Sequence, residues 1–175
     1  MPGAVFGDGA VRRLAVETTL RLATAGDVEF LYNLLKVALG PHVELVFGPW
    51  KEEEERAKFF EVTRPGEHQI VERAGEPIGC LKVQRSSSEF KLNRVFLLPA
   101  FQGRGIGSEL VRDLVLDAHS AGLPVRLRVF KINPARRLYE RLGFVVTGET
   151  EFHVNMESTF LGSTKSDIVE VYPEK

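Results

Sequence analysis

Cysteine, net charge and long apolar runs are all scarce in this sequence. Its single cysteine, Cys80, cannot form an internal disulfide, which fits a reducing compartment and predicts a cytoplasmic protein. The formal net charge of −1 gives no reason to expect nucleic acid or an anionic membrane as a partner. The apolar runs are too short to cross a bilayer, and Met1-Pro2-Gly3 leads into a mixed segment, so we expect no secretory signal. Cys80 lies in an apolar, strand-like run, which favours a buried inert thiol over a nucleophile.

Length and composition indicate one globular domain with short extensions. The chain has 175 residues, 43% hydrophobic and 27% charged, which is enough to build a core. Residues 1–16 hold three glycines and no clear periodicity, so they are interpreted as an N-terminal extension. We expect the domain to span residues 17–157. Residues 158–175 form a C-terminal extension, in which 167–172 could add one short strand.

The first half predicts a strand, two helices and three strands. A short strand at 19–23 precedes a helix that begins at Thr24, with Asp27 as its capping-box partner. Gly40-Pro41 predicts the end of this helix, followed by a turn-rich loop over 41–50. A second helix is expected over 51–62, and its run of glutamates is interpreted as a solvated face. Closely spaced strands follow at 69–71, 77–83 and 90–98.

The second half alternates helices and strands. The apolar spacing predicts a helix over 103–120, a strand over 125–130 and a helix from Asn133 to Gly143. A last strand region begins at 144 and extends toward 156. The strands at 90–98 and 125–130 should run parallel through a helical crossover. We therefore expect an α/β (α+β) fold with a mixed, mostly antiparallel central sheet and helices on both faces.

The most informative segment is Gln102-Gly103-Arg104-Gly105-Ile106-Gly107, between a predicted strand and a predicted helix. Glycines allow close approach of the backbone to a ligand, and a helix start presents unpaired N–H groups. The segment therefore predicts a socket for a phosphate or pyrophosphate. It matches neither the Rossmann fingerprint nor a P-loop, and an ordinary strand-to-helix turn is the alternative.

A second motif, Asn133-Pro134 followed by Leu138-Tyr139-Glu140-Arg141-Leu142-Gly143-Phe144, comes after the next strand. Together with Pro99-x-x-Gln102-Gly-Arg-Gly-Ile-Gly, it makes residues 18–157 resemble a GNAT-type N-acetyltransferase. The resemblance implies a splayed parallel strand pair that holds acetyl-CoA, without a metal. The residues implied to bind the cofactor are Val95, Phe96, Leu97, Gln102, Gly103, Arg104, Gly105, Ile106, Gly107, Ser108, Asn133 and Tyr139.

The resemblance also gives Tyr139 and Asn133 roles beyond their local ones. Tyr139 lies on the apolar stripe of its helix, so packing alone could explain it. In the family, the matching tyrosine protonates the departing thiolate, which makes Tyr139 the predicted general acid. Asn133 is the expected helix cap, and the resemblance adds a contact with the pantetheine arm.

The base that accepts the amine proton remains unassigned. No carboxylate lies on either splayed strand, and Glu44, Glu149, Glu151, His153 and a solvent relay all stay open. His42, Phe47 and Trp50 are candidate walls of the acceptor pocket, although Trp50 could simply anchor the second helix. The predicted acceptor contacts are Glu44, Trp50 and His153, and nearby acidic side chains would favour a cationic amine.

We therefore expect an N-acetyltransferase that moves acetyl from acetyl-CoA directly to a primary amine. The expected partner is a small-molecule or peptide amine, with no nucleic acid and no membrane, and a homodimer is left open. A non-catalytic acyl-CoA-binding or sensing module is the alternative, because no strand carboxylate is present. A nucleotide-binding oxidoreductase is a third hypothesis, disfavoured by the lack of Rossmann context.

Overall fold

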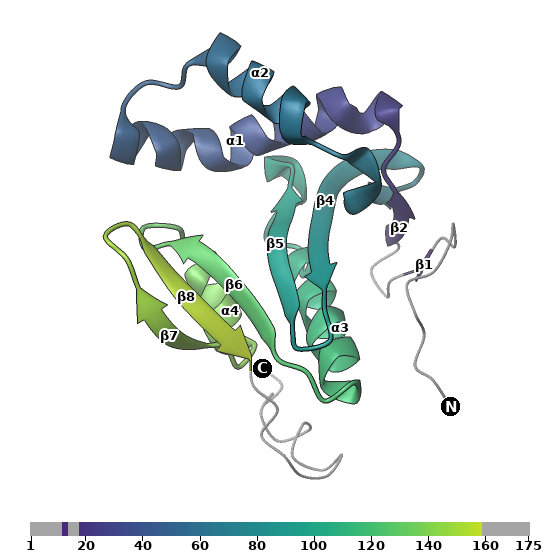
Figure 1. Ribbon diagram of the computed structural model, residues 1–175. Coiled ribbons are helices and arrows are strands. Elements are labelled where there is room, and N and C mark those ends of the chain that lie inside the picture. The colour runs from purple at the N-terminus through teal and green to yellow at the C-terminus, as the bar shows by residue number, and fades with distance from the viewer. Residues whose placement is uncertain (1–11, 14–17, 159–175) are drawn as a thin grey trace.

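The computed structural model describes residues 12–13 and 18–158, which contain an eight-stranded mixed sheet with helices on both faces (Figure 1). The sheet order is β1-β2-β3-β4-β5-β6-β8-β7, and among these strands only β5 and β6 pair in parallel. The expected fold class is confirmed. The strands are β1 (Arg12–Arg13), β2 (Thr18–Leu22), β3 (Gln69–Arg73), β4 (Glu76–Arg85), β5 (Phe90–Leu97), β6 (Val125–Phe130), β7 (Val145–Glu149) and β8 (His153–Ser158). The helices are α1 (Val28–Phe47), α2 (Glu52–Val62), α3 (Ile106–Ser120) and α4 (Arg136–Arg141).

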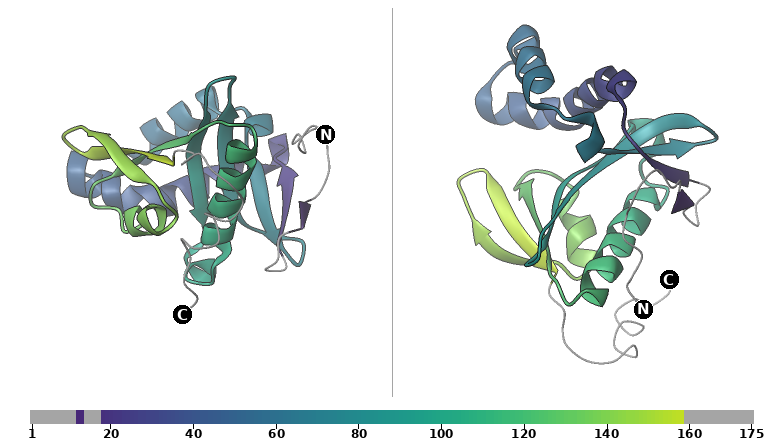
Figure 2. Two further views of the ribbon diagram at one scale, coloured as in Figure 1. Left: turned by 90° about the horizontal axis from the view of Figure 1, so that it is seen from below. Right: turned by 45° about the vertical axis from the view of Figure 1, so that its right-hand side comes forward.

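Each face of the sheet carries its own hydrophobic cluster, because successive strand residues point to opposite sides. Val71 and Leu81 pack in the cluster that includes α3, while Ile70 and Cys80 pack in the cluster that includes α1 and α2. Figure 2 shows α3 on one side of the strands and α1 with α2 on the other. Cys80 is buried, and burial raises the pKa of its thiol to about 12, so the expected inert thiol is confirmed.

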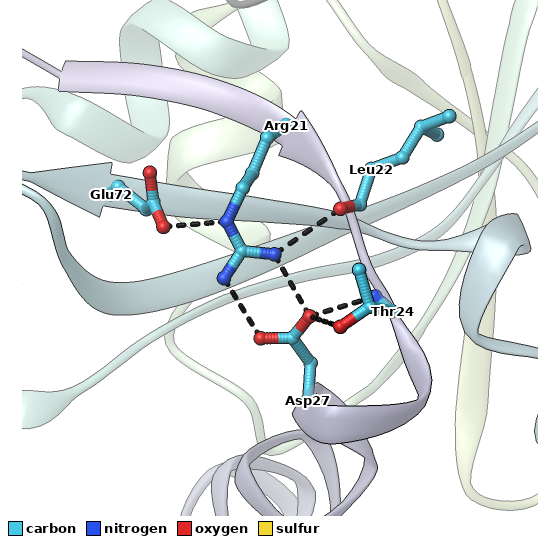
Figure 3. A network of polar contacts seen from close by, with 5 residues as sticks. All are labelled: Arg21, Leu22, Thr24, Asp27 and Glu72. Atoms are coloured by element: carbon cyan, nitrogen blue, oxygen red, sulfur yellow. Dashed lines mark hydrogen bonds and ion pairs between the residues drawn. The ribbon is translucent and has the colours of Figure 1, made fainter. Parts of the chain in front are cut away.

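A polar network fixes the start of α1 against the sheet (Figure 3). The Asp27 carboxylate accepts hydrogen bonds from the Thr24 N–H (2.7 Å) and hydroxyl (2.8 Å), as the capping pattern predicts. Arg21 on β2 donates two bonds to Asp27 and one to Glu72 on β3. The Arg21 guanidinium holds the pKa of Asp27 well below its usual range. The entry of the chain into α1 is therefore tied to two strands.

The predicted end of the first helix at Gly40-Pro41 is wrong, because α1 continues through Pro41 to Phe47. Contacts beyond the proline account for the extension. His42 stacks on the Phe130 ring at 6.1 Å, and the Phe47 and Phe152 rings meet edge to face at 5.1 Å. Such packing outweighs one missing main-chain hydrogen bond. The helix ends instead at Gly48, so most of the expected 41–50 loop is helical.

By length and composition alone, the segment Ala25–Phe47 could cross a membrane, which the sequence did not suggest. In the structure, however, this helix packs against the domain: Leu31, Tyr32 and Leu34 are buried in the cluster between α1, α2 and the sheet. We therefore describe it as a helix of the sheet-based domain.

Two further boundaries differ from the expectations. The helix predicted from residue 103 begins at Ile106, because Gly103 and Gly105 adopt left-handed backbone angles (φ 71° and 83°). The last strand region is a hairpin of two strands, β7 and β8, with β8 paired to β6. The segment 167–172 lies outside the described residues.

Candidate active site at the splayed strands

The parallel strands β5 and β6 pair only at their beginnings. The register joins Phe90, Lys91 and Leu92 to residues 125–127, and no pairing continues beyond Leu92. At this point the β4–β5 register shifts, so that Asn93 is left out of the ladder as a bulge. β6 turns to β8 and pairs with it along its whole length. The two parallel strands therefore separate, as the sequence predicts for the cofactor site.

The bulge decides which main-chain groups face the gap. The Leu98 N–H donates to the Ile78 carbonyl of β4 at 2.8 Å. In an antiparallel pair the bonded residues alternate, so the main-chain groups of Phe96 point to β4, and those of Val95 and Leu97 point to the gap. The Gln102 side chain donates to the Leu97 carbonyl at 2.9 Å. Of the three predicted strand residues, Val95 and Leu97 thus offer main-chain groups to a ligand.

The glycine loop closes the far end of the gap. Pro99–Phe101 forms a short 3₁₀ turn, and Gly105 then caps α3. A Cβ built on Gly103 or Gly105 would meet no protein atom within 4 Å, so both glycines border open space. The first N–H groups of α3 have no partner inside the helix and present the positive end of its dipole. This arrangement suits an anion such as a diphosphate.

Tyr139 and Asn133 lie on the other wall, around α4. Tyr139 is 7% exposed, lines the cavity and packs edge to face on Phe144. Burial raises the pKa of its hydroxyl to about 12, so it stays protonated at neutral pH. Asn133 accepts the Ala135 N–H at 2.8 Å through Oδ1, which closes a local turn before the helix. The prediction of Asn133 as the helix cap is wrong, because α4 starts at Arg136 with Ala135 as its N-cap.

A cavity of about 740 Å³ joins this gap to the underside of α1. Val37, Pro41 and His42 of α1 line it opposite the strands, because the helix continues past the proline. Among the described residues that line it there is no aspartate or glutamate, whereas Arg94, Arg128 and Arg141 are present. The end of the cavity under α1 is therefore lined by cationic side chains, and not by the acidic ones that the sequence suggested.

Arg94 is held on the α1 side of β5 by a buried histidine. Its Nη1 lies 2.8 Å from Nε2 of His68, which is 0% exposed. A guanidinium can only donate, so Nε2 is the acceptor, and Nδ1 of His68 carries the proton and donates to the Arg64 carbonyl at 3.2 Å. Burial is the main cause that lowers the pKa of His68, and the Arg94 charge adds to it. His68 is thus neutral and fixes the orientation of Arg94.

A ring stack borders the cavity next to β6. Phe130 lies between His42 at 6.1 Å and His153 at 4.2 Å, measured between ring centroids. Arg128 donates to Nδ1 of His153 at 3.1 Å, so the proton of the neutral ring is on Nε2. Burial, followed by the Arg128 charge, lowers the pKa of His153. Of the predicted acceptor contacts, His153 alone lines this cavity.

Several predicted residues lie outside the cavity lining. Glu44 accepts the Trp50 N–H at 3.3 Å, and Trp50 packs partly buried against the cluster of α1 and α2, which is its anchoring interpretation. Glu149 pairs with Lys131 at 2.9 Å, and Glu151 is exposed. The Arg104 guanidinium lies 5.7 Å from the Phe101 ring, and the Ile106 side chain is buried in the core.

Sequence reasoning missed Arg94 and His68 as a pair and placed His42 in a loop. A signal for Arg94 was present, because arginines recur on the splayed strands at 94, 126 and 128 without a carboxylate among them. Arg126 is neutralised by Glu89 and Glu157. Among the residues described here, neither Arg94 nor Arg128 has a carboxylate partner.

Comparison with known proteins finds one family model that matches part of the chain. Residues 64–146 match the model of the acetyltransferase (GNAT) domain. A search of curated proteins found no match.

Solved structures share the fold. PaiA N-acetyltransferase from Thermoplasma acidophilum, solved in complex with coenzyme A, is 17% identical with a TM-score of 0.65, over 82% of this chain and 99% of its own. Ard1 from Thermoplasma volcanium is 20% identical with a TM-score of 0.60, over 81% and 96%. A spermidine N-acetyltransferase SpeG chimera from Vibrio cholerae and hSSAT is 22% identical with a TM-score of 0.60, over 82% and 95%. The matched segment 64–146 contains the parallel strands β5 and β6, the glycine loop and α4, so this part of the chain is similar to a GNAT acetyltransferase domain.

Proposed function

We propose that this protein transfers the acetyl group of acetyl-CoA directly to a primary amine. The observation that carries the proposal is the parting of β5 and β6 beyond Leu92, which opens a lined cavity from the glycine loop to α1. The residues fit the cofactor. Gly103, Gly105 and Ser108 line the cavity at the start of α3, where main-chain N–H groups can hold a diphosphate.

Acetyl-CoA supplies the activated thioester. The main-chain groups of Val95 and Leu97 would hold the pantetheine amides as an added strand does, and Asn133 and Gln102 line the same gap. Arg104, exposed in the glycine loop, adds charge near the phosphates. Phe96 lines the wall of the cavity. Ile106 is the first residue of α3, so its N–H group belongs to the unpaired first turn of that helix.

Transfer forms a C–N bond from the amine to the acetyl carbon and breaks the C–S bond. The Tyr139 hydroxyl donates its proton to the departing sulfur, and its high pKa keeps that proton available at neutral pH. The proton of the attacking amine passes to solvent or to the imidazole of His42, which lines the cavity, since the unprotonated nitrogen of His153 already accepts a hydrogen bond from Arg128. Holding amine and thioester together supplies most of the remaining acceleration.

The test is Tyr139→Phe, assayed by release of the CoA thiol with a panel of amines. We expect kcat to fall about a hundredfold, because protonation by a positioned acid contributes roughly 10² or more. Acetyl-CoA affinity, measured by calorimetry, should change little. Tyr32→Phe is the matched control, since Tyr32 is buried on α1 and bonds to Glu52 outside the cavity lining. Unchanged turnover in Tyr139→Phe would remove the acid role.

A non-catalytic acyl-CoA-binding module is the second candidate. It is favoured by one observation: the described residues that line the cavity include no aspartate or glutamate that could act as a carboxylate base. The same thiol-release assay distinguishes the two functions. A module would bind acetyl-CoA and release no thiol with any amine, whereas an enzyme releases thiol in proportion to acetylated product.

A further inference from the structure

We propose that the acceptor is a primary amine that also carries an anionic group, and that Arg94 binds this anion through its guanidinium. The inference rests on the proposed function, because it names the substrate class for the same cavity. The chemistry is that of a carboxylate or a phosphate placed a few bonds from the amine, which a planar guanidinium recognises with paired N–H donors.

Arg94 is a preformed anion receptor. It lies half-buried on the α1 face of β5, immediately after the Asn93 bulge where the strands part. One of its donors is occupied by His68, and its carbon Cζ lies 5.5 Å from the Phe59 ring centroid. In the described part of the chain its other nitrogens have no partner, yet none of them is sealed from solvent. Arg94 also lines the cavity, where a ligand can reach donors that are accessible to solvent.

A half-buried guanidinium without a counter-ion is costly, since desolvation is not compensated by a charge. Burial accordingly lowers the pKa of Arg94. The neighbouring strand arginine shows the ordinary solution, because Arg126 binds both Glu89 and Glu157. Arg94 has a neutral histidine in that place instead. The ligand is therefore the natural source of the missing negative charge.

Two carboxylates of the early helices are engaged elsewhere. Glu29 pairs with Arg56 at 2.6 Å and Glu52 with Lys36 at 2.6 Å, and neither glutamate lines the cavity. Arg128 adds a second cation on the same face of the sheet, beside His153. A polyamine would meet only like charge or neutral groups here, which disfavours it by electrostatic mismatch. An amine with its own anion would pair with Arg94 and present the amine to the thioester.

The experiment compares short amines that differ in one group. β-Alanine carries a carboxylate, 2-aminoethyl phosphate a phosphate, ethanolamine a neutral hydroxyl, and spermidine further cations. Thiol release gives kcat/KM for each with wild type, Arg94→Met, Arg94→Lys and the control Arg73→Met, an arginine on β3 outside the cavity lining. We expect wild type to prefer an anionic amine over ethanolamine by about tenfold to a hundredfold, the usual effect of a charged hydrogen bond.

Arg94→Met should abolish this preference mainly through KM, Arg94→Lys should retain part of it, and Arg73→Met should leave it intact. The carboxylate and phosphate arms identify which anion is used. Equal use of ethanolamine or spermidine by the wild type, or a preference that survives in Arg94→Met, would overturn the anion site while leaving acetyl transfer in place.

A binding measurement separates this inference from the proposed function. Calorimetry measures the affinity of wild type and of Arg94→Met for N-acetyl-β-alanine and for N-acetyl-2-aminoethyl phosphate. Each titration is done with and without CoA. Binding that depends on Arg94, without thiol release in any assay, would support the anion site and contradict acetyl transfer. Absence of binding by both acetylated anions to the wild type would refute the anion site whatever the turnover.

Discussion

The two ends of the cavity are built by different chemistry. At the glycine loop the groups that face the cavity are mainly main-chain donors, from Val95 and Leu97 on β5 and from the first turn of α3. Under α1 they are side chains, with Arg94 and His42 contributed by separate elements. The first end is a consequence of strand and helix geometry, and the second depends on which side chains are present.

This difference separates what is general from what is particular in the molecule. Main-chain donors recognise phosphates and amides without regard to the rest of the ligand, so the glycine-loop end fits a cofactor common to a whole family. An arginine oriented by His68, as Arg94 is, would distinguish one acceptor from another by charge. Substitutions at the two ends should therefore affect different ligands.

The largest expected effect is at the cofactor end, from Gly105→Ala. Gly105 has φ 83°, and a Cβ there would enter open space at the start of α3 rather than meet protein. We expect acetyl-CoA affinity to fall about a hundredfold in calorimetry, because the added methyl lies against the diphosphate and a left-handed alanine is strained by roughly 1 kcal/mol.

Gly122→Ala is the matched control at the opposite end of α3. Gly122 also has a left-handed φ, 70°, and open space around its Cβ, but it does not line the cavity. Its thermal stability should drop as much as that of Gly105→Ala, while acetyl-CoA affinity stays at the wild-type value. Equal affinity in the two variants would show that the loop does not hold the cofactor.

The cofactor end could be predicted from the sequence because local patterns determine it. Each of its parts is a short continuous segment of the sequence: the strand before the loop, the glycines at 103 and 105, and the Asn133-Pro134 turn. Even so, the Asn93 bulge was not predictable, since it is visible only as a register shift against β4. The bulge decides that Val95 and Leu97, and not Phe96, turn their main chain to the gap.

The acceptor end could not be predicted in the same way, because it depends on contacts between distant residues. Gly40-Pro41 normally ends a helix, yet α1 continues past it. Just after the proline, His42 stacks on Phe130, a residue far away in the sequence, and no local pattern predicts that contact. Arg94 and His68 are likewise brought together by the pairing of β3, β4 and β5. Glu44 and Trp50, chosen for their residue types, serve the turn after α1 instead.

A smaller effect is expected at the acceptor end from His68→Leu, which removes the acceptor that orients Arg94. KM for an anionic amine should rise about tenfold, because a mobile guanidinium loses much of its advantage in ordering the ligand. Acetyl-CoA affinity and kcat should change little. His68→Gln, whose amide oxygen can accept a hydrogen bond, should restore most of the loss. A rise in KM that is the same for ethanolamine, or no rescue by glutamine, would contradict a positioning role.

The smallest effect on ligands is expected from Asp27→Asn, which weakens the attachment of α1 to β2 and β3 without touching the cavity lining. The free energy of unfolding should fall by about 2 kcal/mol near neutral pH, since a paired, mostly buried carboxylate is lost. The folded-state pKa of Asp27 is depressed, so its contribution is full above the unfolded value and disappears as pH falls through the folded one. Urea titrations of both proteins should therefore differ by a constant amount from pH 7 to about 5 and converge in stronger acid. A difference that grew on acidification would mean that Asp27 stabilises the fold in its protonated form, and the attachment of α1, which covers the acceptor end, would need another origin.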